Sequence, residues 1–110
     1  MNTKIQYLYR DAHNFKKFAE VVVFGLVDGD QLFSLLKDGM FFIPSYVGLE
    51  SLQEKPLKSY DHVWHELESV VPTNDPASVT IDSKTIQTFF HKAHKDGWDE
   101  TMAFREMELL

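Results

Sequence analysis

The chain has 110 residues, no cysteine, and 17 acidic against 11 basic side chains, which give it a formal net charge of −6. Its length is typical of a single domain, and a hydrophobic fraction of 44% excludes a disordered chain. The lack of cysteine excludes disulfides and thiolate chemistry, and the net negative charge argues against nucleic-acid binding, which depends on neutralising phosphates. We therefore expect one folded domain over residues 1–110 without a nucleic-acid partner.

The first predicted elements form an antiparallel hairpin. Residues 3–10 mostly alternate between two faces and include aromatic and branched side chains, which is typical of a strand. Residues 11–18 contain the turn-forming Asp11 and Asn14 and predict a loop. Residues 19–25 are apolar on both faces and predict a central strand of the sheet.

A helix is predicted next, over residues 28–39. Asp28 can cap it, with Gln31 three residues later in the capping-box position, and Gly39 is a plausible end. Residues 40–59 contain two prolines and predict a long connection that carries two adjacent phenylalanines into the core.

The second half of the chain predicts one strand and two helical segments. Branched and aromatic side chains in residues 62–71 favour a strand. After a loop, residues 82–97 have apolar side chains at helical spacing, with Asp82 or its neighbour as a cap and a glycine at the end. Residues 98–110 predict a further short helical segment.

Together these elements predict an α+β fold: a small, mainly antiparallel sheet of about three strands with helices packed on one face. The patterns leave the strand order open. The polar N-terminal segment lacks the layout of a signal peptide, and the apolar run at residues 21–27 is far shorter than the ~20 residues that cross a bilayer. We expect a cytoplasmic protein with no membrane partner.

Two H-x-x-H pairs are candidate metal ligands: His62 with His65, and His91 with His94. On a helix, His91 and His94 would share a face, but they lie among lysines, which is typical of a solvated face. In a strand, His62 and His65 would point to opposite faces; in a helix they would join Glu66 as zinc ligands. We expect no metal and no cofactor. The alternative is a metal site formed by His62, His65 and Glu66.

The segment RDAHN in the first loop is the other candidate site. Arg10 could hold a carboxylate or phosphate, and Asp11 with His13 could exchange protons near neutral pH. The structural interpretation, which we favour, is a hairpin turn with an ion pair from Arg10 to an acidic strand residue. The candidate catalytic residues are Arg10, Asp11, His62, His65 and Glu66, and the candidate ligand-binding residues are Arg10, Asn14 and Asp61.

The stretches YLYRDAHNFK (residues 7–16) and DHVWHELES (residues 61–69), with GMFFIP between them, resemble a family of small, mostly bacterial proteins. Its members open with Y-L-Y-R-D-A-x-N-(F/Y)-K and carry a D-H-x-W-H-E-like segment near the middle. The resemblance implies one small α+β domain and implies no particular activity. It points to the candidate residues above, with His13 at a variable position, and says nothing of His91 or His94.

The favoured function is a non-enzymatic cytoplasmic module that binds a protein or serves as an accessory domain, and a homo-oligomer is left open. An acidic composition, many aromatic residues and the lack of an organised catalytic motif favour it. Aromatic residues anchor many protein interfaces, although most such residues lie in a core. The aromatic candidates are Tyr46, Trp64, Trp98 and Phe104.

Two other functions are left open. The first is a small metal-assisted hydrolase in which His62, His65 and Glu66 hold an ion or move protons while Arg10 holds an anionic substrate. The second is an inhibitor that offers its acidic face to a basic partner protein.

Overall fold

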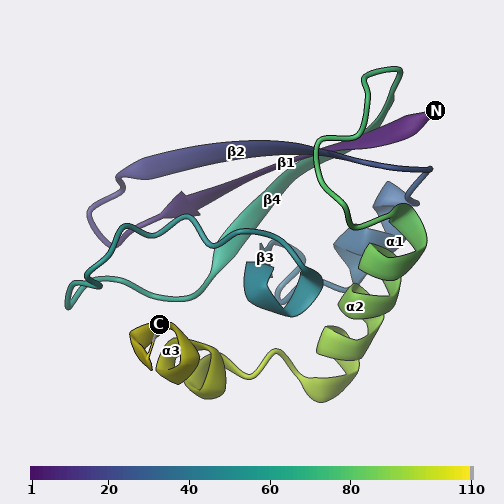
Figure 1. The fold of residues 1–110 in the computed structure, drawn as a ribbon. Coiled ribbons are helices and arrows are strands. Elements are labelled where there is room, and N and C mark those ends of the chain that lie inside the picture. The colour runs from purple at the N-terminus through teal and green to yellow at the C-terminus, as the bar shows by residue number, and fades with distance from the viewer. Residues whose placement is uncertain (110) are drawn as a thin grey trace.

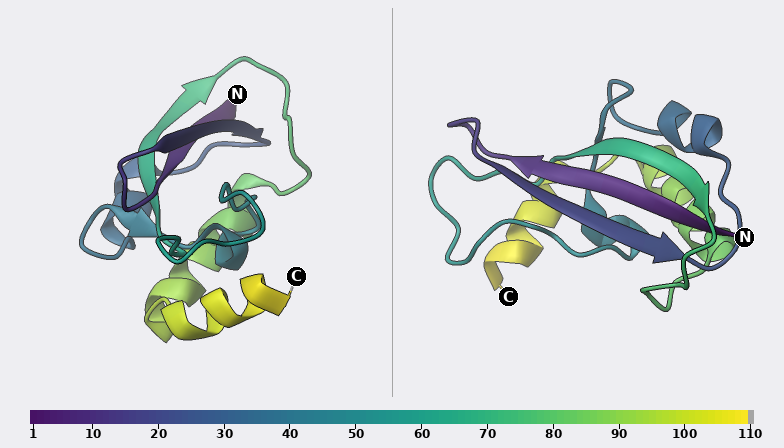
Figure 2. Two further views of the ribbon diagram at one scale, coloured as in Figure 1. Left: turned by 90° about the vertical axis from the view of Figure 1, so that its left-hand side faces the viewer. Right: turned by 90° about the horizontal axis from the view of Figure 1, so that it is seen from above.

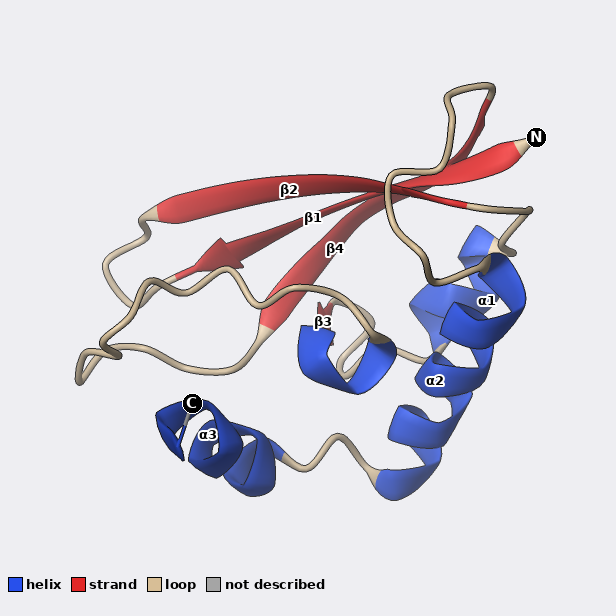
Figure 3. Ribbon diagram, in the orientation of Figure 1, coloured by secondary structure: helices blue, strands red, loops and turns tan. Residues whose placement is uncertain are grey.

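The computed structural model describes residues 1–109 and forms a four-stranded antiparallel sheet in the order β2-β1-β4-β3, with helices on one face (Figures 1 and 3). The α+β prediction is confirmed. The sheet has four strands rather than about three, because two residues of the predicted connection pair with the start of β4. The elements are β1 (Asn2–Arg10), β2 (Lys16–Val23), α1 (Gly29–Ser34), β3 (Phe41–Phe42), the 3-10 helix η1 (Pro44–Val47), β4 (His65–Thr73), α2 (Ser83–Asp96) and α3 (Glu100–Leu109).

Strand β2 lies at an edge of the sheet and begins at Lys16, so the prediction of a central strand from residue 19 is wrong. The apolar run led to the wrong prediction because the outer face of the strand is covered at Val22 by a loop and not by a second layer of helices or strands. The N–H of Val22 donates to the hydroxyl of Ser78 at 2.8 Å, and the N–H of Ser78 donates to the carbonyl of Val22 at 2.8 Å.

Strand β4 contains a bulge that the alternation of residues did not predict. Leu67 and Ser69 lie opposite adjacent residues of β1, so Glu68 is the extra residue. The bulge reverses the two faces beyond it, and Val70 therefore packs against the core although the simple alternation placed it on the other face from Leu67. The strand begins at His65, three residues later than predicted.

The predicted caps are confirmed, but the first helix is shorter than predicted. The carboxylate of Asp28 accepts from the N–H of Gln31 at 3.2 Å, and that of Asp82 accepts from the N–H of Thr85 at 2.8 Å. Helix α1 ends before Gly39, whose φ of 68° instead forms a turn leading into β3.

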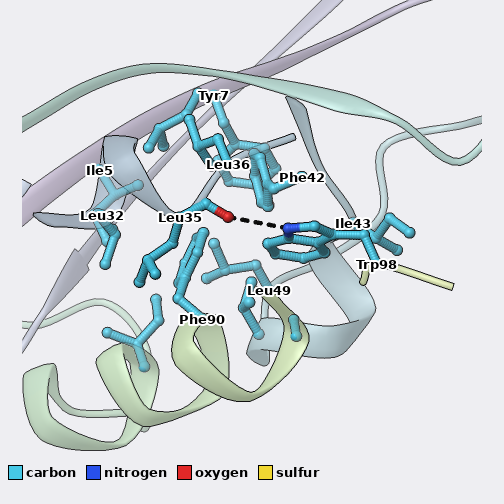
Figure 4. Close-up of a cluster of buried hydrophobic side chains, with 14 of the residues drawn as sticks. Ile5, Tyr7, Leu32, Leu35, Leu36, Phe42, Ile43, Leu49, Phe90 and Trp98 are labelled. Atoms are coloured by element: carbon cyan, nitrogen blue, oxygen red, sulfur yellow. Dashed lines mark hydrogen bonds between the residues drawn. The ribbon is translucent and has the colours of Figure 1, made fainter. Parts of the chain in front are cut away.

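The core lies between the inner face of the sheet and the helices (Figure 4). Phe42 from β3 packs against Phe90 from α2, with ring centroids 5.7 Å apart, and Phe90 meets Trp98 edge-on at 5.9 Å. The indole Nε1 of Trp98 donates to the carbonyl of Leu35 at 3.0 Å, which joins the segment before α3 to the residue that follows α1. Among residues 1–109, no helix is both long enough and apolar enough to cross a membrane.

Replacing Phe90 by Ala should lower the free energy of unfolding by about 3–5 kcal/mol, because it removes a fully buried ring and leaves a cavity. The neighbouring Phe89 is 37% exposed, so Phe89→Ala should cost about 1 kcal/mol or less. Urea denaturation measures both variants. Equal losses would contradict the orientation of α2 described above.

Candidate functional site

His65 faces the core from the first position of β4 and is fully buried. Its Nε2 accepts from the N–H of Leu52 at 3.0 Å, and its Nδ1, 3.1 Å from the carbonyl oxygen of Val63, carries the proton because that oxygen can only accept. Burial, with a smaller contribution from the neighbouring His62, lowers the pKa of His65 to about 4, so the ring is neutral at pH 7. Neither nitrogen is free to bind a ligand.

His62 lies in the segment before β4, with both of its ring nitrogens also in hydrogen bonds. Its Nε2 donates to the carbonyl of Arg10 at 2.7 Å, and its Nδ1 accepts from the N–H of Trp64 at 3.1 Å. The ring packs against that of Tyr9, with centroids 5.0 Å apart. His62 therefore attaches the segment before β4 to the end of β1.

Asp61 is held by Tyr9 and by the backbone. The hydroxyl of Tyr9 donates to Asp61 Oδ1 at 2.6 Å, and the N–H of Lys58 donates to Asp61 Oδ2 at 2.7 Å. Burial, followed by the hydrogen bond to Asp61, raises the pKa of Tyr9 well above its usual range, so Tyr9 stays a neutral donor. Both oxygens of the predicted ligand-binding carboxylate are thus used to order residues 58–62.

Arg10 makes the predicted ion pair with an acidic residue of the neighbouring strand. Its Nε lies 2.9 Å from Glu66 Oε2, and a second guanidinium nitrogen donates to Glu66 Oε1 at 3.4 Å. A third nitrogen donates to the side-chain oxygen of Asn14 at 2.7 Å. The hydrogen bonds and charge of Glu66 raise the pKa of Arg10. The pair joins β1 to β4 and leaves little of the guanidinium fork for an external anion.

The turn between β1 and β2 has the Asx-type geometry that the structural interpretation predicted. Asp11 Oδ1 accepts from the N–H groups of His13 at 2.8 Å and Phe15 at 3.0 Å, and Asn14 has a φ of 64°. The His13 ring stacks on that of Tyr60, with centroids 4.4 Å apart. Asp11 and His13 therefore shape the turn, and no hydrogen bond joins their side chains in the described part of the chain.

The structure brings four of the five candidate catalytic residues to one cleft of about 630 Å³ beside β3 and β4. Its apolar part is Trp64, Phe41 and Met40, with Lys37 Nζ 5.6 Å from the centre of the Trp64 ring. His65 is not at the cleft because it faces the core, on the opposite side of β4 from Glu66. Among the side chains of residues 1–107 there is no group of three His, Asp or Glu placed to hold a metal ion. The polar candidates at the cleft are Arg10, Asp11, His62 and Glu66.

Sequence reasoning missed the aromatic residues that are most exposed. Trp98 is buried, and Tyr46, Trp64 and Phe104 are partly buried against the core. Beginning the second strand at residue 16 would have placed Phe18 on its outer face, which is the signal that was overlooked. On α2, His91 and His94 are both exposed, and His94 Nδ1 lies 3.2 Å from the carbonyl of Leu35. The most exposed aromatic residues are Phe15, Phe18 and Phe24.

Stability should fall on acidification partly because of His65. Above pH 6.5, the ordinary pKa of histidine, the ring is neutral in both the folded and the unfolded chain. Between 6.5 and about 4 the unfolded chain binds a proton that the folded chain does not, so the free energy of unfolding falls by up to ~1.4 kcal/mol per pH unit. Below about 4 both states are protonated, and this loss is complete.

Urea denaturation of the native chain, His65→Gln and His91→Gln at a series of pH values measures this contribution. His65→Gln should be less stable at neutral pH but should lose less stability on acidification. His91→Gln changes an exposed residue of α2 and should follow the native chain. The same acid dependence in the native chain and in His65→Gln would contradict the described role of His65.

No family model, no curated protein and no solved structure matches this chain. The resemblance based on residues 7–16 and 61–69 therefore stays a prediction.

Proposed function

We propose that this chain is a non-enzymatic protein-binding module whose docking site is the open edge of β2. The observation that carries the proposal is an eight-residue edge strand with one exposed aromatic side chain, Phe18, and unpaired backbone groups. Partner chains commonly add a strand to such an edge, because its N–H and C=O groups are already aligned. The lack of cysteine agrees with a cytoplasmic location.

The hydrogen bonds that the polar candidate residues make within the chain favour binding over catalysis. A general base or a metal ligand needs a lone pair that can reach a substrate or an ion. The ring nitrogens of His62 and His65 are engaged within the chain, and Glu66 holds Arg10. These groups therefore stabilise the fold through contacts within the chain.

The free part of the β2 edge follows from the pairing with β1. Bonds in an antiparallel ladder alternate, so every second residue of an edge strand turns its N–H and C=O away from the sheet. The N–H and C=O groups of Val22 point away from the sheet, as their bonds to Ser78 show. By the same alternation, the backbone groups of Glu20, Phe18 and Lys16 also point away from the sheet. Among the backbone groups of residues 1–109 and the side chains of residues 1–107, none bonds to these last three on their outer side.

The side chains around this edge also suit a protein partner. Phe18 is 63% exposed on the outer face of β2, and Phe15 is 79% exposed in the turn before it. A cleft of about 400 Å³ lies beside the start of β2 and is lined by Phe15, Lys17 and Tyr60, among others. Exposed aromatic rings beside unpaired backbone groups give both affinity and side-chain specificity to an added strand.

Replacing Phe18 by the photoreactive analogue p-benzoylphenylalanine in the native cells should yield a discrete covalent adduct with a protein after illumination. The matched control is the same analogue at Phe24, which is 68% exposed but lies beyond the part of β2 that Ser78 covers. Mass spectrometry identifies the adducts. Absence of an adduct at position 18, or equal adducts at both positions, would contradict docking at the β2 edge.

A further inference from the structure

The unpaired backbone groups on the free edge of β2 are arranged symmetrically about Phe18. On one side the strand ends at the turn, where the N–H of Asn14 already bonds to the carbonyl of Asp11 at 3.0 Å. On the other side Ser78 occupies the outward groups of Val22. The free groups therefore belong to three residues, Lys16, Phe18 and Glu20, and Phe18 is the middle one.

Building on the protein-binding function above, we propose that the partner of β2 is a second copy of this chain, paired antiparallel about Phe18. In this register each Phe18 lies opposite the other, and Lys16 of each copy lies opposite Glu20 of the other. The three pairs are of the hydrogen-bonded kind and give about six backbone hydrogen bonds. A shift by two residues in either direction would place Val22 or Asn14 at the interface, where the outward groups are already used.

The charges on the strand favour this register. Lys16, Phe18 and Glu20 project from the same, outer face of β2, so each lysine would lie beside a glutamate of the other copy. Opposite charges directly across an antiparallel pair stabilise it, and like charges destabilise it. Glu20 is held on this face because Gln6 Nε2 donates to its Oε1 at 3.0 Å, which leaves its other oxygen for the lysine.

The shape of the molecule permits this assembly. Figure 2 shows β2 along one side of the sheet, with the loop after β4 lying near its C-terminal end only. The two-fold axis of an antiparallel strand pair is perpendicular to the sheet, so the helices of both copies would lie on one side of a continuous sheet. The contact is narrow, so we expect a dimer that dissociates on dilution.

Sedimentation velocity of the purified chain over a wide concentration range tests the proposal. The native chain should dimerise, while Lys16→Glu and Glu20→Lys should each weaken self-association by about tenfold or more, because each places like charges opposite one another twice. A mixture of the two variants should associate again, since every facing pair is then of opposite charge. Lys92→Glu, which makes the same charge change on an exposed position of α2, should leave self-association unchanged.

Each other result overturns the inference. A native chain that stays monomeric at every concentration excludes the second copy, and an adduct at position 18 with a different protein would then leave the docking edge itself in place. If both single variants dimerise as strongly as the native chain, the interface lies elsewhere. Failure of the mixture to associate would exclude pairing about Phe18. Circular dichroism of each variant shows that the fold is retained.

Discussion

The neutral, buried imidazole of His65 is the interaction on which the irregular part of this structure depends. It accepts from the backbone at Leu52 and donates to the backbone at Val63, so it attaches both ends of a long segment without helix or strand to the start of β4. A buried backbone group without a partner costs about as much as a lost hydrogen bond, so the ring replaces pairing that secondary structure would otherwise provide. Protonation would turn its acceptor into a donor and break the contact with Leu52.

A second set of contacts extends this arrangement to the turn between β1 and β2. Tyr9 holds Asp61, His62 holds the carbonyl of Arg10, and Arg10 holds Glu66. These polar residues lie close together because β1 and β4 are neighbours in the sheet. Their proximity resembles that of an active site, but each donor faces an acceptor of the same chain. The polar groups of this cluster therefore stabilise the fold through contacts with one another.

The two edges of the sheet differ in a way that bears on recognition. The outer edge of β4 is covered by β3 at its start, where Phe41 and Phe42 pair with Glu66 and His65. In the described part of the chain, the edge of β2 is closed only at Val22, through Ser78. Proteins commonly cover or charge an exposed edge strand, because unpaired backbone groups promote association. Here the uncovered part carries a phenylalanine between a lysine and a glutamate, which suits the proposed pairing of two strands.

The sequence by itself determined the α+β class, the hairpin, the caps at Asp28 and Asp82, and the ion pair of Arg10 with an acidic strand residue. These features follow from local spacing and capping, which depend on residues close together in the chain. Only the tertiary structure decided that β2 is an edge, that Glu68 forms a bulge and that His65 is buried. Each of these depends on which distant segment covers a residue. A valine covered by a loop and a valine covered by a strand look the same in sequence, and so do a histidine in a core and a histidine in a site.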